Sequence, residues 1–168
     1  MLATIGYEGA SLDDFIKTLL ASNVEILIDV RERAQSRRKG FSKTALSTAL
    51  TEAGIDYLHL RQLGDPKEGR DAARSGDFKK FRKVYSQVLK SEDAKLAIQD
   101  ILKILPKQNA CLLCYERDHT TCHRKIITDN IETTSNIKAR HLGVVQFGAS
   151  SSKKGRMLHI GEGATASV

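Results

Sequence analysis

Short apolar segments with the character of β-strands alternate with segments of helical periodicity along most of this chain. Five candidate strands, rich in apolar and β-branched residues, occupy residues 2–7, 24–30, 55–60, 109–116 and 137–144. Between them, apolar residues recur at intervals of three and four, the period of an amphipathic helix. Strands that alternate with helices form a parallel sheet covered on both faces. The sequence therefore predicts a three-layer α/β fold with a mostly parallel sheet of about five strands.

Residue types that cap helices mark the expected helix starts. Ser11 and Ser42 each precede apolar residues at helical spacing, and Thr121 precedes "CHRKIITDNIE". We expect all three to be N-caps. Residues 61–77 instead combine glycine, proline and charges of both signs. This composition predicts a long loop, and loops of such length are often functional.

The length and composition are typical of one soluble domain. The chain has 168 residues, of which 40% are hydrophobic and 28% charged, enough for a single core. We expect one α/β domain over residues 1–145 and a loosely held basic tail over 146–168, where large apolar residues are few. No apolar run is long enough to span a membrane, and the N-terminal segment lacks the pattern of a signal peptide. An odd number of cysteines favours reduced thiols, so we expect a cytoplasmic protein without a membrane partner.

Positive charge is concentrated in one segment of the chain. The formal net charge is +7, which suits partners that carry phosphate. Residues 31–43, "RERAQSRRKGFSK", contain six basic residues and one acidic residue. This segment is expected to bind an anionic partner, either a nucleotide or a nucleic acid.

Polar and reactive side chains follow the predicted strands at their carboxyl ends. Ligands of open parallel sheets bind beyond these ends, because the loops there meet at one edge. In chain order, the residues found at these positions are Tyr7, Glu8, Asp29, Arg31, His59, Arg61, Cys114, Glu116, Arg140 and His141.

The segment "CLLCYERDHTTCHR", residues 111–124, contains all three cysteines of the chain. Side chains alternate along a strand, so Cys111 and Cys114 are expected to point to opposite faces of the sheet. This argues against a disulfide between them and against a zinc site with four ligands. We therefore expect Cys111 in the core, and predict neither a metal nor a cofactor.

The remaining residues of this segment can form a reactive site. Cys114 and Glu116 are two positions apart and share a face at the end of the strand. Cys122 is expected near the first turn of the next helix, where the helix dipole and Arg124 favour a thiolate, so we predict that it is the more reactive thiol. The alternative is structural, with His123 holding the loop in place and Arg124 paired with Glu116.

The chain resembles the uncharacterised family called "domain of unknown function 488". The resemblance rests on "TIGYEG", "IDVRERAQSRRKGFS", "IDYLHLRQLGD" and "LLCYERDHTTCHR" followed by "ARHL", and it spans about residues 2–143. It implies a compact α/β domain with a shared site, without implying a reaction. The positions that match the family pattern are Thr4, Gly6, Tyr7, Asp29, Arg31, Ser36, Phe41, Tyr57, Leu63, Gly64, Cys114, Glu116, Cys122, His123, Arg124 and His141.

These observations favour a small enzyme that acts on a phosphate-containing substrate. A thiol nucleophile, a general acid or base and an imidazole form the expected catalytic group. Its members are Cys114, Glu116, Cys122, His123 and Asp29. Substrate binding is expected from arginines that hold phosphate through charge-assisted hydrogen bonds, and from polar neighbours. These residues are Tyr7, Arg31, Ser36, Arg37, Arg38, Arg124 and His141.

Two alternatives compete with the enzyme hypothesis. A nucleic-acid-binding module without catalysis would use the basic segment 31–43 and "SSKKGR" of the tail, with a structural cysteine cluster. Sulfur transfer is the second alternative, because "LIDVRE" looks like the strand that opens rhodanese domains. The cysteine-containing anion loop of that family is absent from "CYERDHTTC".

Overall fold

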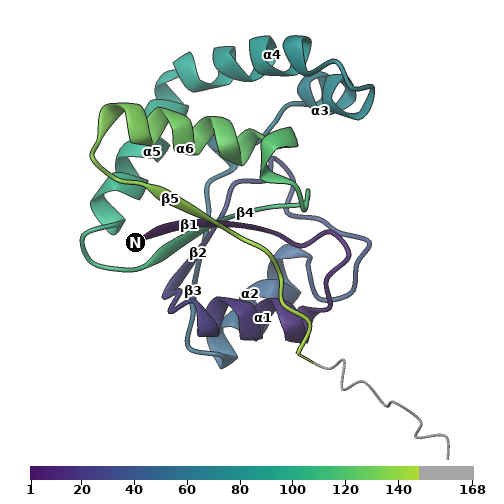
Figure 1. Ribbon diagram of the computed structural model, residues 1–168, viewed down its shortest axis with the longest axis vertical. Coiled ribbons are helices and arrows are strands. Elements are labelled where there is room, and N and C mark those ends of the chain that lie inside the picture. The colour runs from purple at the N-terminus through teal and green to yellow at the C-terminus, as the bar shows by residue number, and fades with distance from the viewer. Residues whose placement is uncertain (148–168) are drawn as a thin grey trace, which may run out of the picture.

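The computed structural model describes residues 1–147 and contains a five-stranded sheet with helices on both faces (Figure 1). All neighbouring strands are parallel, in the order β3-β2-β4-β1-β5. The predicted three-layer α/β fold is confirmed, and each strand lies within one of the segments expected for it. The strands are β1 Leu2–Gly6, β2 Ile26–Asp29, β3 Asp56–His59, β4 Ala110–Cys114 and β5 Ala139–Leu142.

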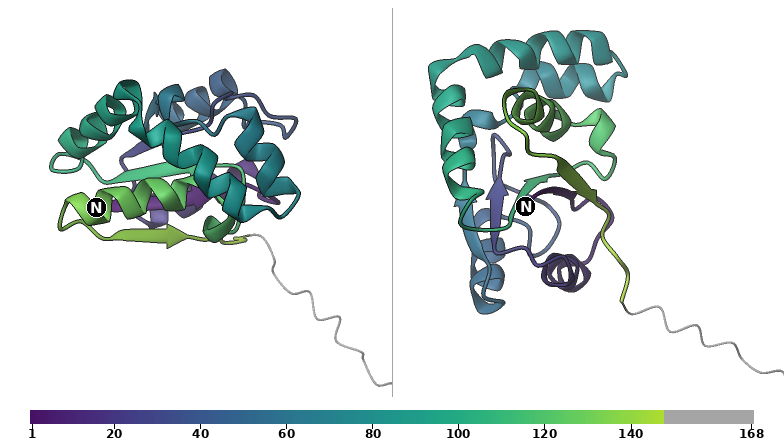
Figure 2. Two further views of the ribbon diagram at one scale, coloured as in Figure 1. Left: turned by 90° about the horizontal axis from the view of Figure 1, so that it is seen from above. Right: turned by 60° about the vertical axis from the view of Figure 1, so that its left-hand side comes forward.

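The helices divide between the two faces of the sheet. One face is covered by α1, Leu12–Ala21, and α2, Lys43–Glu52. On the other face, α5, Glu92–Ile104, and α6, His123–Thr134, lie next to the sheet, and α4, Phe78–Lys90, packs outside them (Figures 1 and 2). This arrangement leaves the carboxyl edge of the sheet free to carry a site.

The expected helix starts are found to within one residue. Ser11 caps α1, and its side chain accepts a hydrogen bond from the backbone N–H of Asp14 at 3.1 Å. Ser42 occupies the N-cap position of α2 without a side-chain hydrogen bond. The N-cap of α6 is Cys122 instead of the expected Thr121, because Thr121 ends a short 3-10 helix.

The segment 61–77 is a correction to the sequence prediction of a long loop. It contains a 3-10 helix, Arg61–Leu63, and the helix α3, Lys67–Arg74. The buried residues of α3 are Gly69 and Ala72, so the helix shows little of the apolar periodicity that reveals a helix in a sequence. It is held by packing against α4.

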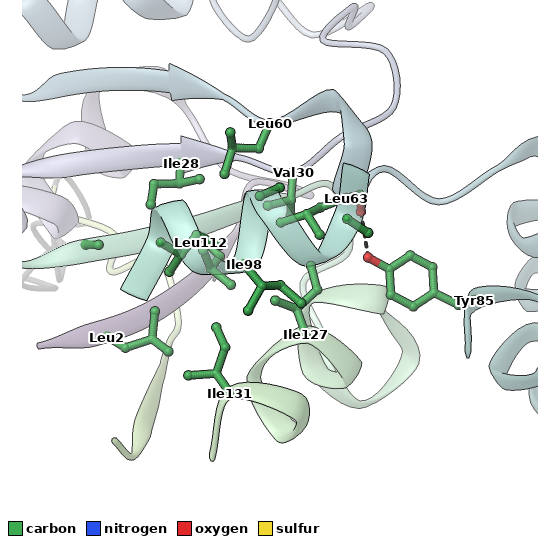
Figure 3. Packing of buried hydrophobic residues seen from close by; sticks show 14 of the residues in the cluster. Leu2, Ile28, Val30, Leu60, Leu63, Tyr85, Ile98, Leu112, Ile127 and Ile131 are labelled. Carbon is green, nitrogen blue, oxygen red and sulfur yellow. Dashed lines mark hydrogen bonds between the residues drawn. The ribbon is translucent and has the colours of Figure 1, made fainter. Parts of the chain in front are cut away.

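Two apolar cores lie on opposite faces of the sheet. The core beneath α4, α5 and α6 includes Ile28 and Leu112, and the buried Tyr85 hydroxyl donates a hydrogen bond to the carbonyl of Leu63 at 2.6 Å (Figure 3). The core beneath α1 and α2 includes Cys111, which is fully buried there. The expected alternation of β4 is therefore observed, and Cys111 takes no part in the site described below.

The chain beyond β5 runs back along α1. The backbone N–H of Val145 donates to Thr18 Oγ1 at 3.0 Å, and that of Phe147 donates to Asp14 Oδ1 at 2.9 Å. The tail expected from residue 146, with its "SSKKGR" segment, lies outside the described residues except for positions 146 and 147. Among residues 1–147, no helix is both long and apolar enough to cross a membrane.

Candidate active site

A pocket of about 300 Å³ opens at the carboxyl edge of the sheet, where β1, β2 and β4 end. Open parallel sheets bind ligands at this edge. Five of the residues predicted from the sequence line the pocket, and they are Tyr7, Arg31, Cys114, Glu116 and His123. The sheet therefore brings together side chains that are separated by more than a hundred residues in the sequence.

Cys114 is the last residue of β4, and its thiol has two close polar neighbours. The sulfur lies 2.8 Å from Glu116 Oε2 and 3.6 Å from His123 Nδ1. The Glu116 contact follows from strand alternation, which turns both side chains to one face. The His123 contact requires α6 to begin beside the end of β4, which only the folded chain provides.

His123 is oriented by the backbone of a neighbouring strand end. Its Nε2 lies 2.8 Å from the carbonyl oxygen of Val30. A carbonyl only accepts hydrogen bonds, so Nε2 carries a proton, and Nδ1 faces the sulfur atoms of Cys114 and Cys122 at 3.6 and 3.7 Å. The imidazole is thus held in one orientation at the base of the pocket.

The three groups shift one another's pKa values. Burial opposes ionisation of Cys114, but the hydrogen bond from Cys122 and the charge of His123 outweigh it and hold the pKa of Cys114 well below its ordinary value. Burial would lower the pKa of His123, but the charge of Cys114 raises it to about 9. Burial and the adjacent Cys114 raise the pKa of Glu116 to about 7. At neutral pH these shifts favour a thiolate, an imidazolium and a carboxyl group that carries a proton part of the time.

Cys122 lies behind this group and does not line the pocket. Its side chain is 2% exposed, and burial together with the neighbouring Cys114 raises its pKa well above the ordinary value. Cys114 thus lines the pocket and Cys122 does not, whereas the sequence led us to expect that Cys122 is the more reactive thiol. Cys114, Cys122 and His123 are also the residues that could hold a metal ion, since one donor atom of each lies within 4.8 Å of the others.

Asp29 and Arg31 form a buried ion pair beside the pocket. Arg31 donates from Nε to Asp29 Oδ1 at 2.8 Å and from Nη2 to Oδ2 at 2.6 Å. Its Nη1 donates to the hydroxyl of Tyr7 at 3.0 Å, and the Tyr57 hydroxyl donates to Asp29 at 2.7 Å. Asp29 is fully buried and does not line the pocket. In the structure, the Asp29 carboxylate holds the Arg31 side chain in the pocket wall.

Several residues that line the pocket are not revealed by the sequence patterns. Arg70 and Arg74 extend from α3, and Arg70 pairs with Glu32. The spacing of four places both arginines on one helical face, a signal that the loop-like composition of 61–77 hides. Asp65 lies at the base of the pocket, where burial raises its pKa to about 6. Tyr115 also lines the pocket without a sequence signal, whereas the lining residues Arg33 and Gln35 belong to the basic segment 31–43.

Five predicted substrate-binding residues lie outside this pocket. Ser36, Arg37 and Arg38 belong to the segment that leads to α2, and both arginines are exposed. His141 lies on β5, where Nδ1 is 2.8 Å from Thr4 Oγ1 and the ring stacks on His119. His141 is separated from the thiol cluster at the end of β4 by the strand β1, and none of these four residues lines the pocket.

Arg124 is the fifth of these residues, and it is buried beneath the loop that follows β4. Its side chain is 1% exposed, and Nη2 donates to the carbonyl of Arg117 at 3.0 Å. Gly6 makes this packing possible, because a Cβ there would collide with the Glu116 carbonyl and with Arg124 Nη1. Arg124 therefore packs against this loop and does not line the pocket.

The fold and the site define a three-layer α/β protein with a thiol, carboxyl and imidazole cluster at the carboxyl edge of its sheet. The chain belongs to the family described as "Domain of unknown function DUF488", which matches residues 11–131. No curated protein and no solved structure matches the chain. The family resemblance expected from the sequence motifs is thereby confirmed.

Proposed function

We propose that this protein is an enzyme in which the Cys114 thiolate attacks a phosphate-containing substrate. The observation that carries the proposal is the position of the Cys114 sulfur in the pocket wall, 2.8 Å from Glu116 and 3.6 Å from His123. A nucleophile needs a neighbour that stabilises its ionised form, and a leaving group needs a proton donor. His123 and Glu116 are suited to these two roles.

The charge of the pocket rim supports phosphate as the bound group. Four of the lining residues are arginines, namely Arg31, Arg33, Arg70 and Arg74. Asp29 offsets the charge of Arg31, and Glu32 offsets that of Arg70. Arg74 lies 3.8 Å from a carboxylate oxygen of the exposed Asp71, which offsets part of its charge. Arg33 is exposed and forms no salt bridge with the residues that the structure describes, so it supplies most of the positive charge that would hold a phosphate through charge-assisted hydrogen bonds.

We infer the hydrolysis of a phosphate ester in two steps. In the first, Cys114 Sγ bonds to phosphorus, the bond to the leaving oxygen breaks, and Glu116 gives that oxygen its proton. In the second, water attacks the phosphorus and gives a proton to the Glu116 carboxylate, while the sulfur–phosphorus bond breaks and restores the thiolate. A carboxyl group with a pKa of about 7 can donate a proton in the first step and accept one in the second at neutral pH.

Turnover of a panel of phosphate compounds tests this proposal. The panel comprises an aryl phosphate, nucleoside mono- and triphosphates, and short single- and double-stranded oligonucleotides, with products measured by mass spectrometry. We expect one class to be hydrolysed and Glu116→Gln to lower kcat by about 100-fold, because the amide cannot transfer the proton.

Glu52→Gln is the matched control for this variant. Glu52 is an exposed residue at the end of α2, so the same chemical change there should leave kcat unaltered. Failure of the whole panel to turn over, or equal activity of the Glu116→Gln protein, would remove the basis of the proposal.

We propose a cytoplasmic location for this reaction. The support is chemical, since the three cysteines are free and buried in the described part of the chain, and reduced thiols persist in reducing compartments. A nucleophilic thiolate also requires such a compartment to stay active.

Nucleic-acid binding through the segment 31–43 is a second candidate function. The observation that favours it is the exposure of Arg37, Arg38 and Lys39 in a row beside the site. Side chains exposed in this way can contact successive phosphates of a backbone, which gives affinity without sequence readout. This surface would also serve an enzyme whose phosphate ester is part of a nucleic acid.

Neutralising this row should weaken binding and reduce its salt dependence. For Arg37→Ala, Arg38→Ala and Lys39→Ala combined, the slope of log affinity against log salt should fall by about 0.9 for each phosphate of duplex DNA that the native side chains neutralise. Fluorescence anisotropy with labelled DNA and RNA over a salt series measures both quantities.

The control variant removes the same amount of positive charge from another surface of the protein. Lys79, Arg82 and Lys83 are exposed on α4, away from the basic segment, and their replacement by alanine should leave the slope unchanged. Equal losses of affinity in the two triple variants would mean that net charge, and not this row, determines the binding.

A further inference from the structure

The sulfur and nitrogen atoms of the Cys114, Cys122 and His123 cluster have the spacing of zinc ligands. Zn–S bonds of about 2.3 Å and Zn–N bonds of about 2.0–2.1 Å in a tetrahedron place sulfur and nitrogen about 3.6 Å apart. The observed distances from His123 Nδ1 are 3.6 Å to Cys114 Sγ and 3.7 Å to Cys122 Sγ. All three donor atoms lie within 4.8 Å of one another, so an ion could enter with small side-chain movements.

The surroundings of His123 are those of a metal ligand. Zinc-bound imidazoles usually donate their second N–H to a carboxylate or a backbone carbonyl, which fixes the tautomer and the ring. His123 makes this contact through Nε2 to the Val30 carbonyl at 2.8 Å. The nitrogen that remains, Nδ1, is the one that faces both sulfur atoms.

The backbone explains how two adjacent residues can reach one ion. Cys122 is extended, with φ −123° and ψ 147°, and His123 is the first residue of α6. The change of backbone direction between them turns both side chains toward the end of β4. A regular strand or helix, in which neighbouring side chains diverge, would not allow this.

We infer that Cys114, Cys122 and His123 form a binding site for one Zn²⁺ ion, with a fourth coordination position that opens to the pocket. Cys114 and His123 line the pocket together with Glu116, so water or the Glu116 carboxylate can occupy that position. Two thiolates and one imidazole suit Zn²⁺, whereas Mg²⁺ and Ca²⁺ prefer oxygen ligands.

Metal binding and the proposed reaction compete for the same sulfur atom. Cys114 cannot attack a substrate while its lone pair is bonded to zinc, so Zn²⁺ should inhibit the enzyme reversibly. This consequence rests on the proposed function, whereas the binding site itself rests on the geometry of the three ligands. Two separate measurements therefore test the two parts.

Cobalt spectroscopy of the full-length, metal-free protein tests the site. Co²⁺ is the probe, because its thiolate bonds give a near-ultraviolet charge-transfer band whose intensity follows the number of sulfur ligands. We expect one equivalent to bind, the band to fall by about half in Cys114→Ser and in Cys122→Ser, and one equivalent of Zn²⁺ to displace the cobalt. Each variant should bind Zn²⁺ at least about 100-fold more weakly, since even second-shell changes cost about 10- to 100-fold.

Cys111→Ser is the matched control, since Cys111 lies on the other face of the sheet. It should keep the full band. A wild-type spectrum without a thiolate band, or one that depends on Cys111, would overturn the site. Because the cysteine variants can also be compared by their circular dichroism, loss of metal is distinguishable from loss of fold.

Turnover in the presence of Zn²⁺ tests the consequence. One equivalent should abolish hydrolysis by the wild-type protein, and a chelator should restore it. If zinc binds to this site and raises turnover, the site is supported and the metal-free thiol mechanism is overturned. If no metal binds while Cys114 remains essential for turnover, the zinc site fails and the proposed function stands.

Discussion

Replacing Cys114 with serine should lower the turnover of the phosphate substrate by at least about 1000-fold, since removal of an enzyme's nucleophile commonly costs more than this. The serine hydroxyl is nearly isosteric with the thiol and preserves the pocket. It remains protonated beside His123, whereas the pKa of the Cys114 thiol is held well below its ordinary value. Steady-state kinetics on the substrate class identified in the panel gives the ratio of kcat values.

Alkylation provides a second readout that does not depend on the substrate. In metal-free protein, iodoacetamide should modify Cys114 first, because it lines the pocket and favours the thiolate. Cys122 should follow, and Cys111 should react only on unfolding. The rate of Cys114 alkylation should also rise less steeply with pH around neutrality than that of an ordinary thiol, since the pKa of Cys114 is held well below its ordinary value.

The control for these measurements is Cys111→Ser, which should retain turnover. A protein in which Cys122 is alkylated first would return the reactive role to the start of α6, as the sequence suggested. Full turnover by the Cys114→Ser protein would exclude a covalent role for Cys114.

Replacing Asp29 with alanine should lower the free energy of unfolding by about 3–5 kcal/mol, the usual cost of breaking a buried ion pair by removing one partner. Arg31 would lose three hydrogen bonds to the carboxylate, two from its side chain and one from its backbone N–H, while its side chain stays 6% exposed. The Tyr57 hydroxyl would lose its acceptor as well. Urea denaturation followed by circular dichroism measures the change.

Asp13→Ala is the matched control, because Asp13 also pairs with a basic residue, Lys17, but at the surface. Exposed pairs contribute about 0–1 kcal/mol, so this variant should unfold almost like the wild type. If Asp29→Ala instead keeps its stability and loses its turnover, the carboxylate acts in the reaction, as the sequence suggested. If both stability and turnover are retained, neither role holds.

The strands and most helices could be predicted because their signals are local. β4 carries five buried residues in a row, and α1 has its serine cap and apolar face within eleven residues. The helix α3 could not be predicted in this way, because its stability comes from packing against α4 and not from an apolar stripe of its own.

The parts of the site that could be predicted also depend on residues close together in the sequence. Cys114 and Glu116 share a face for a reason that strand geometry supplies. Which of Cys114 and Cys122 lines the pocket could not be predicted, because it depends on how α6 packs beside the end of β4. Asp29 and Arg31 differ in the same way, since Asp29 ends β2 and Arg31 follows it closely, but only Arg31 lines the pocket.

The sequence by itself determined the α/β class, the order of the strands along the chain, the core position of Cys111 and the residue types at the carboxyl edge. Hydrophobic periodicity and strand alternation involve only a few neighbouring residues, so each of these features can be read from a short segment of the sequence. Only the tertiary structure determined which of those residues contact one another. His123 faces Cys114 because α6 starts beside the end of β4, and Arg70 reaches the pocket because α3 packs on α4. These contacts between distant residues depend on the sheet order β3-β2-β4-β1-β5 and on long-range packing. No short sequence pattern predicts them.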